Sequence, residues 1–302
     1  MRAAARRYKG AVHSWQIENE VTSRTFWDST VDEYVEVLRT AHRVIKREDP
    51  SARVVLAGIA ADVAVEWLSV DAASASKQPW VRDFAATLDY ILQRASGAFD
   101  VVDVHLYLSP NTMARRLDYV RARMAAAGSN TPIWVTETGG PDTRWPYDRV
   151  PPGQGPADTR YHERAPDTER AEVIERLVIA LGAGAERVFW HSLRTPALRD
   201  VWDGTSLIRA GEQTPAFAAY QQVASTLQGF TSVRRLDLEA GVSAYIFETP
   251  HGGVTAIWGR QPATIHLAGA PDEVTVTDVQ GRISLQPARA LQVTSSPIFV
   301  ER

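Results

Sequence analysis

The 302-residue sequence contains no cysteine, which excludes disulfide bonds, thiolate metal ligands and a cysteine nucleophile. It also lacks any apolar run close to the roughly 20 residues that a membrane-spanning helix needs. The first residues, MRAAARRYKG, are basic but lack the apolar core of a signal peptide. We therefore expect the chain as given to be cytoplasmic, and to be secreted only if an upstream segment has been lost.

A strong net charge is missing as well. The formal charge is −3 at pH 7, so the electrostatics do not favour nucleic acid or an anionic membrane as a partner. His13, His42, His191 and His266 show no spacing typical of metal ligands. The GQGP segment at 153–156 lacks the preceding strand and the Lys-Ser/Thr of a phosphate loop. We therefore predict neither a catalytic metal nor a cofactor.

What the sequence does contain, up to about residue 230, is an alternation of apolar strand-like runs with amphipathic helices. This alternation predicts a parallel sheet, and continuous apolar runs such as VVLAGI predict strands buried on both faces. A doubly wound fold would need a Gly-rich turn after the first strand, and the sequence has none there. The strands are expected at 11–17, 53–59, 101–107, 132–138 and 187–193, and the helices at 30–48, 79–95, 112–127, 167–184 and 214–228.

Local signals support several of the helix starts. Thr30 and Glu33 have the spacing of a capping box. Pro79 suits the first turn of its helix, and Asp167 is a plausible cap for a later one.

The pattern changes after residue 230. Residues 231–302 consist of short β-rich segments separated by glycine and proline, which predicts a small antiparallel β-sandwich domain behind an α/β domain at 1–230. Between two expected elements, residues 141–166 form a Pro- and Gly-rich loop far longer than the usual connection of about 2–6 residues. Such a loop either shapes an active site or is a surface insertion.

Two of the expected parallel strands run into glutamates. The first continues as WQIENE to Glu20, and the fourth, PIWVTET, reaches Glu137. In α/β barrels ligands bind at the carboxyl ends of the strands, and a pair of carboxylates there is what glycoside hydrolysis requires. Glu18 precedes Asn19 and is expected to point elsewhere, into a salt bridge. Each glutamate alone is a weak signal, and their shared context makes the pair stronger.

The segments WQIENE, VDVHLY, VTETGG and VFWHSL together resemble the retaining glycoside hydrolases of clan A. These are (β/α)8 enzymes in which an Asn-Glu pair ends the fourth strand and a second Glu ends the seventh. The helix PAFAAYQQVASTLQGF and the trailing β domain resemble the β-xylosidase and α-L-iduronidase family. The resemblance implies that Glu20 is the acid/base, that Glu137 is the nucleophile, and that Asn19 binds the sugar 2-hydroxyl.

The same resemblance implies roles for four further residues. Tyr107 would donate a hydrogen bond to the nucleophile, and His105 would line the pocket. Trp190 would form a platform under the sugar ring, and Trp145 in the long loop would contact the substrate at the rim.

The chain departs from the family in where the Asn-Glu strand lies. That strand is the first here and not the fourth, so the first three strand–helix units are lacking and we expect an incomplete TIM-type (β/α) barrel of about five parallel strands. Two open sheet edges invite association, so we predict a homo-oligomer that covers the open barrel. We expect weak activity on carbohydrate substrates that are small or aryl β-glycosides. The alternative is a catalytically inactive remnant that binds carbohydrate through Trp190, Trp145 and the β domain.

Overall fold

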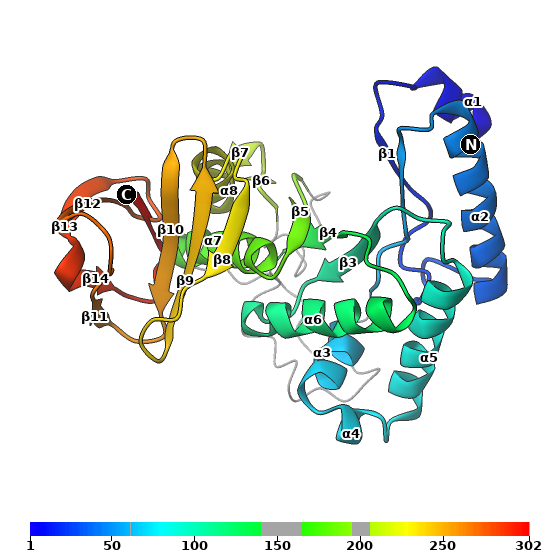
Figure 1. The fold of residues 1–302 in the computed structure, drawn as a ribbon, viewed down its shortest axis with the longest axis horizontal. Coiled ribbons are helices and arrows are strands. Elements are labelled where there is room, and N and C mark those ends of the chain that lie inside the picture. The colour runs from blue at the N-terminus through cyan, green and yellow to red at the C-terminus, as the bar shows by residue number, and fades with distance from the viewer. Residues whose placement is uncertain (61, 140–164, 195–205, 302) are drawn as a thin grey trace. The chain divides into compact units, whose positions relative to one another are not determined.

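The computed structural model describes residues 1–302 except 61, 140–164, 195–205 and 302 (Figure 1). The described chain divides into two compact units. The first comprises Met1–Thr138 with Ala185–Phe189, and the second comprises Gly139–Gly184 with Trp190–Arg302. Because the two units are compact separately, each is described by itself.

The strands of the first unit follow one another in space as they do in the sequence. β1 pairs in parallel with β2, two parallel bridges join the β2 segment to β3, β3 pairs in parallel with β4, and β4 lies next to β5. The predicted parallel arrangement is therefore confirmed for β1 to β4. The bounds are β1 (Ser14–Gln16), β2 (Arg53–Val55), β3 (Val102–Leu106), β4 (Ile133–Thr138) and β5 (Ala185–Trp190).

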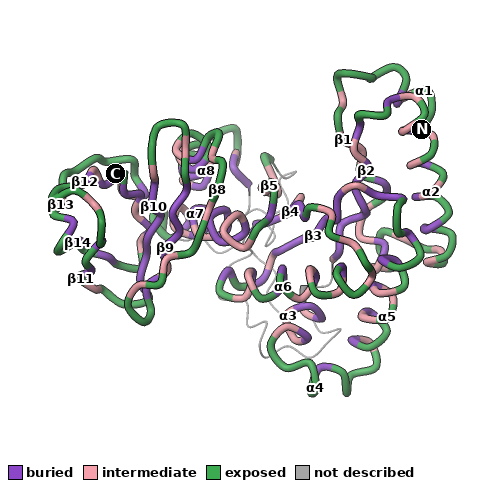
Figure 2. Tube along the Cα trace, viewed as in Figure 1, coloured by how far each residue is buried: buried purple, intermediate pink, exposed green. Residues whose placement is uncertain are grey.

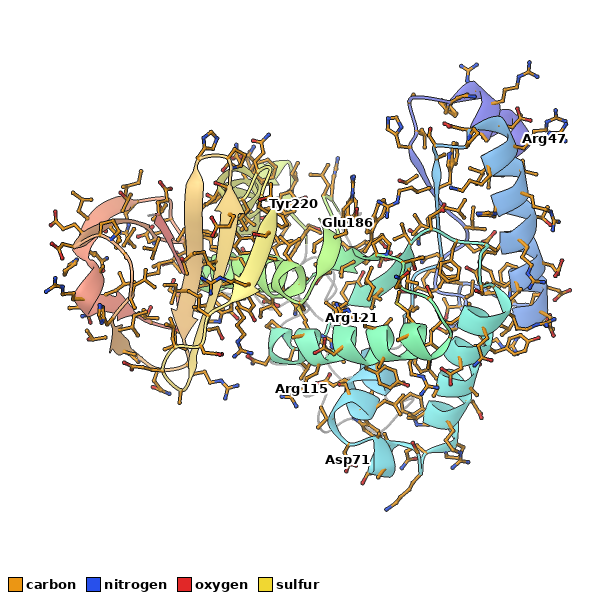
Figure 3. The ribbon with its side chains drawn as sticks, viewed as in Figure 1. Arg47, Asp71, Arg115, Arg121, Glu186 and Tyr220 are labelled. Carbon is orange, nitrogen blue, oxygen red and sulfur yellow. The ribbon has the colours of Figure 1, made fainter. Side chains whose placement is uncertain are left out.

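β3 is buried at every position, as Figure 2 shows by its purple trace. The expectation of strands covered on both faces is confirmed for this strand. Beside it, Trp134 of β4 packs with Val55 and Val101. The indole N–H of Trp134 donates to Glu186 of β5 at 2.7 Å, and Glu186 also accepts two hydrogen bonds from Arg53. Glu186 is labelled in Figure 3.

Helices connect these strands, and most begin where the sequence predicts. In α2 the Thr30 hydroxyl accepts from the Glu33 backbone while the Glu33 carboxylate accepts from the Thr30 backbone, so the capping box is confirmed. Pro79 occupies the first turn of α5 as expected. The helices of this unit are α1 (Arg2–Arg7), α2 (Val31–Glu48), α3 (Asp62–Val70), α4 (Ala72–Ala75), α5 (Pro79–Arg94) and α6 (Pro110–Ala126).

Three local predictions were wrong. α3 was not predicted, because its segment DVAVEWLSV is short and largely apolar and so shows no clear polar face. α6 begins at Pro110 and not at 112, because Ser109 caps it by accepting from Asn111 N–H. Asp167 does not cap α7 (Pro166–Gly182). Ala165 is the N-cap residue there, and Asp167 lies in the first turn, where it pairs with Arg170.

The second unit contains an antiparallel sheet of six strands in the order β13-β12-β15-β10-β9-β8, with β11 and β14 paired beside it. The change to antiparallel structure after residue 230 is therefore confirmed, whereas a two-layer sandwich stays a prediction. The strands are β6 (Ile208–Arg209), β7 (Glu212–Gln213), β8 (Ser232–Arg235), β9 (Val242–Thr249), β10 (Gly252–Gly259), β11 (Ala263–Ile265), β12 (Glu273–Thr277), β13 (Ile283–Pro287), β14 (Leu291–Val293) and β15 (Ile298–Glu301).

Helices α7 and α8 (Pro215–Thr226) belong to this second unit. Gly182 near the end of α7 lies directly against the Tyr245 ring of β9, where a Cβ would come within 2.3 Å of a ring carbon. In the second unit α7 and α8 are grouped with the C-terminal strands. The domain boundary at residue 231 stays a prediction. None of the helices in the described ranges combines the length and the apolarity needed to cross a lipid bilayer.

Candidate active site

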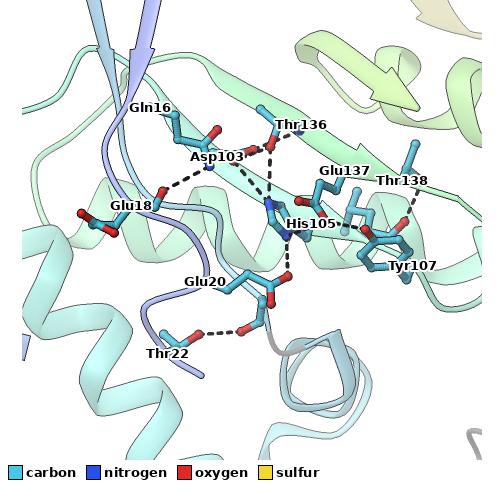
Figure 4. A network of polar contacts seen from close by, with 12 residues as sticks. Gln16, Glu18, Glu20, Thr22, Asp103, His105, Tyr107, Thr136, Glu137 and Thr138 are labelled. Atoms are coloured by element: carbon cyan, nitrogen blue, oxygen red, sulfur yellow. Dashed lines mark hydrogen bonds and ion pairs between the residues drawn. The ribbon is translucent and has the colours of Figure 1, made fainter. Parts of the chain in front are cut away.

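The chain turns sharply after β1, at the Asn-Glu motif. Ile17 N–H still bonds to Val55 of β2, but Glu18 and Glu20 both have positive φ, at 64° and 42°. Left-handed backbone at a residue other than glycine costs about 1–3 kcal/mol and is concentrated at functional sites. As a result the Glu20 carboxylate points to His105 while that of Glu18 points away (Figure 4).

β3 and β4 bring the remaining groups to the same place. In the parallel register His105 lies beside Glu137, and only 1% of His105 is exposed. Its Nδ1 lies 2.6 Å from Glu20 Oε1 and 3.4 Å from Glu137 Oε2. The Tyr107 hydroxyl donates to Glu137 Oε2, which is the contact that the resemblance implied. The structure therefore brings together Glu20, His105, Tyr107 and Glu137.

Two residues that the sequence analysis did not select complete this network. Asp103 of β3 is fully buried, and it accepts hydrogen bonds from the Thr136 backbone N–H at 3.0 Å and from the Thr136 hydroxyl at 2.5 Å. His105 Nε2 lies 3.3 Å from the Thr136 hydroxyl oxygen and 3.5 Å from Asp103 Oδ2. A carboxylate inside the apolar run VVDVHLY was the signal that could have selected Asp103, because a buried charge needs a partner.

His105 is held as a cation by this surrounding charge. Burial by itself lowers the pKa of His105, but hydrogen bonds to Asp103 and Glu20, together with the charges of Asp103 and Glu137, outweigh it and raise that pKa to about 10. The ring also fills the space above Gly58, where a Cβ would lie 2.0 Å from Nε2. Only glycine at position 58 leaves room for the imidazole in this position.

Within the described ranges, Glu20, His105 and Glu137 are close enough to share a metal ion, because their possible ligand atoms lie within 4.8 Å of one another. A histidine ligand must be deprotonated at the nitrogen that binds the metal. His105 Nδ1 instead faces the oxygens of both glutamates and stays protonated at neutral pH. The arrangement therefore suits proton and charge chemistry better than metal binding.

The structure does not test the roles of the other predicted site residues. Asn19 is partly buried between Glu18 and Glu20, and its contact with a sugar hydroxyl stays a prediction. Trp190 is the last residue of β5 and is partly buried; it belongs to the second unit, so its role as a platform also stays a prediction. Trp145 lies outside the described residues, as does most of the long loop.

Glu18 lines a separate pocket of about 500 Å³ between β1 and α2. The pocket walls include Ile17, Val37 and Val44, with Glu36 as a second carboxylate. Glu18 is therefore outside the cluster, in agreement with the expectation that it points elsewhere.

Comparison with known proteins identifies the family. A family model described as a glycosyl hydrolase catalytic core matches residues 41–220, which is more than half of the chain. The chain belongs to this glycosyl hydrolase family. The match contains His105, Tyr107, Glu137 and Trp190, while Asn19 and Glu20 precede it. The more specific likeness to the β-xylosidase and α-L-iduronidase family stays a prediction.

Solved structures of glycosidases share the fold of this glycosyl hydrolase. A family 51 α-L-arabinofuranosidase from Bifidobacterium longum aligns with a TM-score of 0.61 at 13% identity, over 95% of this chain and 67% of that one. A glucosidase from Croceicoccus marinus gives 0.59 at 14% identity, over 96% and 68%. A family 44 endoglucanase from Clostridium thermocellum gives 0.55 at 14% identity, over 95% and 66%.

At these identities the likeness is one of fold alone. The chain spans about two thirds of the length of those structures. Comparison with curated proteins gave no match.

Proposed function

We propose that this glycosyl hydrolase cleaves β-linked glycosides with retention of configuration, with Glu20 as acid/base and Glu137 as nucleophile. The observation that carries the proposal is the spacing of the two carboxylates, whose facing oxygens lie within 4.8 Å of each other. Retaining enzymes have their carboxyl groups about 5–5.5 Å apart, whereas inverting enzymes leave about 6.5–9.5 Å for a water molecule. The short spacing supports double displacement.

In the first step Glu137 attacks the anomeric carbon, the glycosidic C–O bond breaks, and the proton of Glu20 moves to the leaving oxygen. Tyr107 donates to Oε2 of Glu137, so Oε1 is the oxygen left to form the covalent bond. In the second step water attacks the glycosyl-enzyme, Glu20 takes the proton of that water, and Glu137 departs as a carboxylate.

The substrates that we propose are small β-glycosides with good leaving groups, such as aryl glycosides. Contacts to the rest of a sugar chain supply binding energy that raises the rate. Five strands supply fewer substrate contacts than the eight of a complete barrel. Activity should therefore be weak and should depend little on the length of the substrate. Asn19, Trp190 and Trp145 are the side chains proposed to hold the sugar.

The experiment is a screen of aryl β-glycosides with wild type, Glu137→Ala and a control, Glu186→Gln, whose carboxylate pairs with Arg53 instead. We expect Glu137→Ala to lower kcat/KM by about a thousandfold or more, because it removes the group that forms the covalent bond. Glu186→Gln should retain activity. Equal rates for wild type and Glu137→Ala would refute Glu137 as the nucleophile. The alternative, a catalytically inactive remnant that binds carbohydrate, would then be the only hypothesis left.

Two further readouts test the assigned roles. Proton NMR of the first sugar released should show the β-anomer, and release of the α-anomer would contradict retention. Glu20→Gln should slow substrates with poor leaving groups by about 10²–10⁴-fold and should slow activated aryl substrates much less, because a good leaving group needs little protonation.

The homo-oligomer also remains a proposal. In the described residues β1 pairs with β2 alone, and the pocket that Glu18 lines combines Gln16 of β1 with exposed Met1 and Val37. An exposed apolar patch next to a free strand edge favours a second copy as its cover. A folded monomer in sedimentation at micromolar concentration would contradict it.

A further inference from the structure

Asp103 is a carboxylate with no exposed surface, in the middle of a strand of apolar neighbours. A buried charge is retained only where hydrogen bonds and an opposite charge compensate its lost hydration. Thr136 supplies two hydrogen bonds from the neighbouring strand, through its backbone N–H and its hydroxyl. The opposite charge has to come from His105, whose Nε2 lies 3.5 Å away.

The Thr136 hydroxyl determines which nitrogen of His105 carries a proton. A hydroxyl has a single hydrogen, and that of Thr136 is donated to Asp103 Oδ2. Towards His105 Nε2, at 3.3 Å, the same oxygen can only accept, so Nε2 carries a proton. His105 Nδ1 then faces Glu20 Oε1 across 2.6 Å.

Every ionisable group of the described residues that faces His105 is acidic. Asp103 faces it from β3, Glu20 from the segment after β1, and Glu137 from β4. Tyr107 hydrogen-bonds to Glu137, and Gly58, after β2, adds no charge.

From this geometry we infer that Asp103 is a positioning residue, which acts through Thr136 to hold His105 as a cation with Nδ1–H presented to Glu20 and Glu137. The cation neutralises part of the charge that the two carboxylates would otherwise place in one small pocket. A positive charge at these distances favours a neighbouring negative charge.

Replacement of Asp103 by asparagine should reverse this chain of hydrogen bonds. The asparagine carbonyl can still accept from the Thr136 backbone, but its NH2 group meets the Thr136 oxygen as a donor. The Thr136 hydrogen then turns to His105 Nε2, which becomes an acceptor, and the ring becomes neutral with its proton on Nδ1. Asp103→Asn therefore changes the charge of His105 while the side-chain volume stays the same.

The test is ¹⁵N NMR of the histidine rings as a function of pH, with the His105 signals assigned by their loss in His105→Gln. In wild type we expect both nitrogens of His105 to stay protonated to about pH 9, consistent with its raised pKa. In Asp103→Asn the ring should lose a proton below pH 8. Identical titration of His105 in the two proteins would overturn the inference.

Asp100→Asn is the matched control. Asp100 is a partly buried carboxylate of the same segment that accepts from Val54 N–H and pairs with Lys46, away from His105. Asp100→Asn should leave the titration of His105 unchanged. An equal change in the His105 titration in Asp100→Asn and Asp103→Asn would show a general effect of lost charge and would overturn the inference. If Asp103→Asn does not fold, Thr136→Val removes the hydroxyl link and should lower the pH at which His105 titrates, while Thr136→Ser should preserve it.

The activity readout rests on the proposed function and is separate from the NMR test. The pH profile of kcat/KM of Asp103→Asn should differ in shape from that of wild type, because the positive charge of His105 beside Glu137 is lost. A rate reduced equally at all pH values, with unchanged His105 signals, would indicate a structural role only. A wild type without glycosidase activity would refute the proposed function, and the histidine titration would still test Asp103.

Discussion

Two groups of charged side chains in the described residues, one in each unit, are built differently. The site cluster of Glu20, Asp103, His105 and Glu137 draws on three segments far apart in the sequence, with Glu20 and His105 separated by 85 residues. The second cluster lies on one helix, α7, where Arg176 bonds to Glu172 one turn away, at 2.8–2.9 Å from its Nη2 and Nε atoms.

The difference between the two clusters lies in how their charges balance. In the α7 cluster Arg176 faces Glu172 directly, and a helical i,i+4 spacing alone brings them together. In the site cluster one cation faces three carboxylates, so negative charge stays in excess. An excess of buried charge is costly to fold and is typical of groups that react or bind. The comparison leads us to expect a role in helix stability for the Glu172–Arg176 pair, and it agrees with the proposed role of the site cluster in the reaction.

The largest effect is expected for Arg176→Met in the α7 cluster. The change removes the Arg176 charge that pairs with buried Glu172, so the free energy of unfolding should fall by about 3 kcal/mol. Urea denaturation of wild type and variant measures this difference in the free energy of unfolding. The double variant Glu172→Leu/Arg176→Met should regain most of the loss, because a buried ion pair replaced by apolar side chains is often neutral. A single variant as stable as wild type would contradict the assigned role of the pair.

The site cluster should show its charge in the pH dependence of stability. The pKa of His105 is about 10 in the folded protein and about 6.5 in the unfolded chain. The stabilisation by protonated His105 is therefore complete below pH 6.5 and is lost as the pH rises through 10.

From pH 7 to pH 9 the free energy of unfolding of wild type should fall by about 2 kcal/mol more than that of His105→Gln. The exposed residue His13 offers a control, since His13→Gln should keep the wild-type slope. Parallel curves for wild type and His105→Gln would show that His105 is not held as a cation.

Gly58→Ala tests how tightly the ring of His105 is held. The added methyl would overlap His105 Nε2, so the ring must move away from Asp103 and Glu20. We expect a loss of about 1–2 kcal/mol in stability from overpacking, together with a large loss of activity on aryl glycosides. Gly253→Ala, where a Cβ meets its nearest atom at 3.6 Å, should change neither. Full activity in Gly58→Ala would refute a fixed His105.

The last effect is expected at Glu175, which borders the α7 cluster. Burial and the charge of Glu172 raise the pKa of Glu175 to about 7, while Arg176 lowers it only in part. Ionised Glu175 therefore destabilises the fold, by an amount that grows from about pH 4.5 to pH 7 and is constant above.

Glu175→Gln should raise the free energy of unfolding by up to about 3 kcal/mol at pH 8 and leave it unchanged near pH 4. Exposed Glu36 on α2 is the control, because Glu36→Gln should have no effect at either pH. A gain that is equal at pH 4 and pH 8 would mean that charge is not its cause.

Local patterns predicted much of this fold from the sequence. The five strands and the helices that follow them lie where apolar runs and helical spacing placed them, with the capping box of α2 as predicted. The segment of α3 was missed because a short apolar helix has no distinctive period. The grouping of α7 and α8 with the C-terminal strands also depends on contacts such as Gly182 against Tyr245, which no local pattern contains.

Within the site, too, some features follow from local sequence patterns and others from contacts between distant segments. The sequence by itself determined that Glu20 and Glu137 follow parallel strands, since strand order and the shared carboxyl edge of a sheet follow from apolar patterns and connection lengths. Only the tertiary structure decided that Asp103 and Thr136 orient His105 between those glutamates and that position 58 must be glycine. These relations depend on side-chain distances of about 3 Å between separate strands, which no local sequence pattern contains.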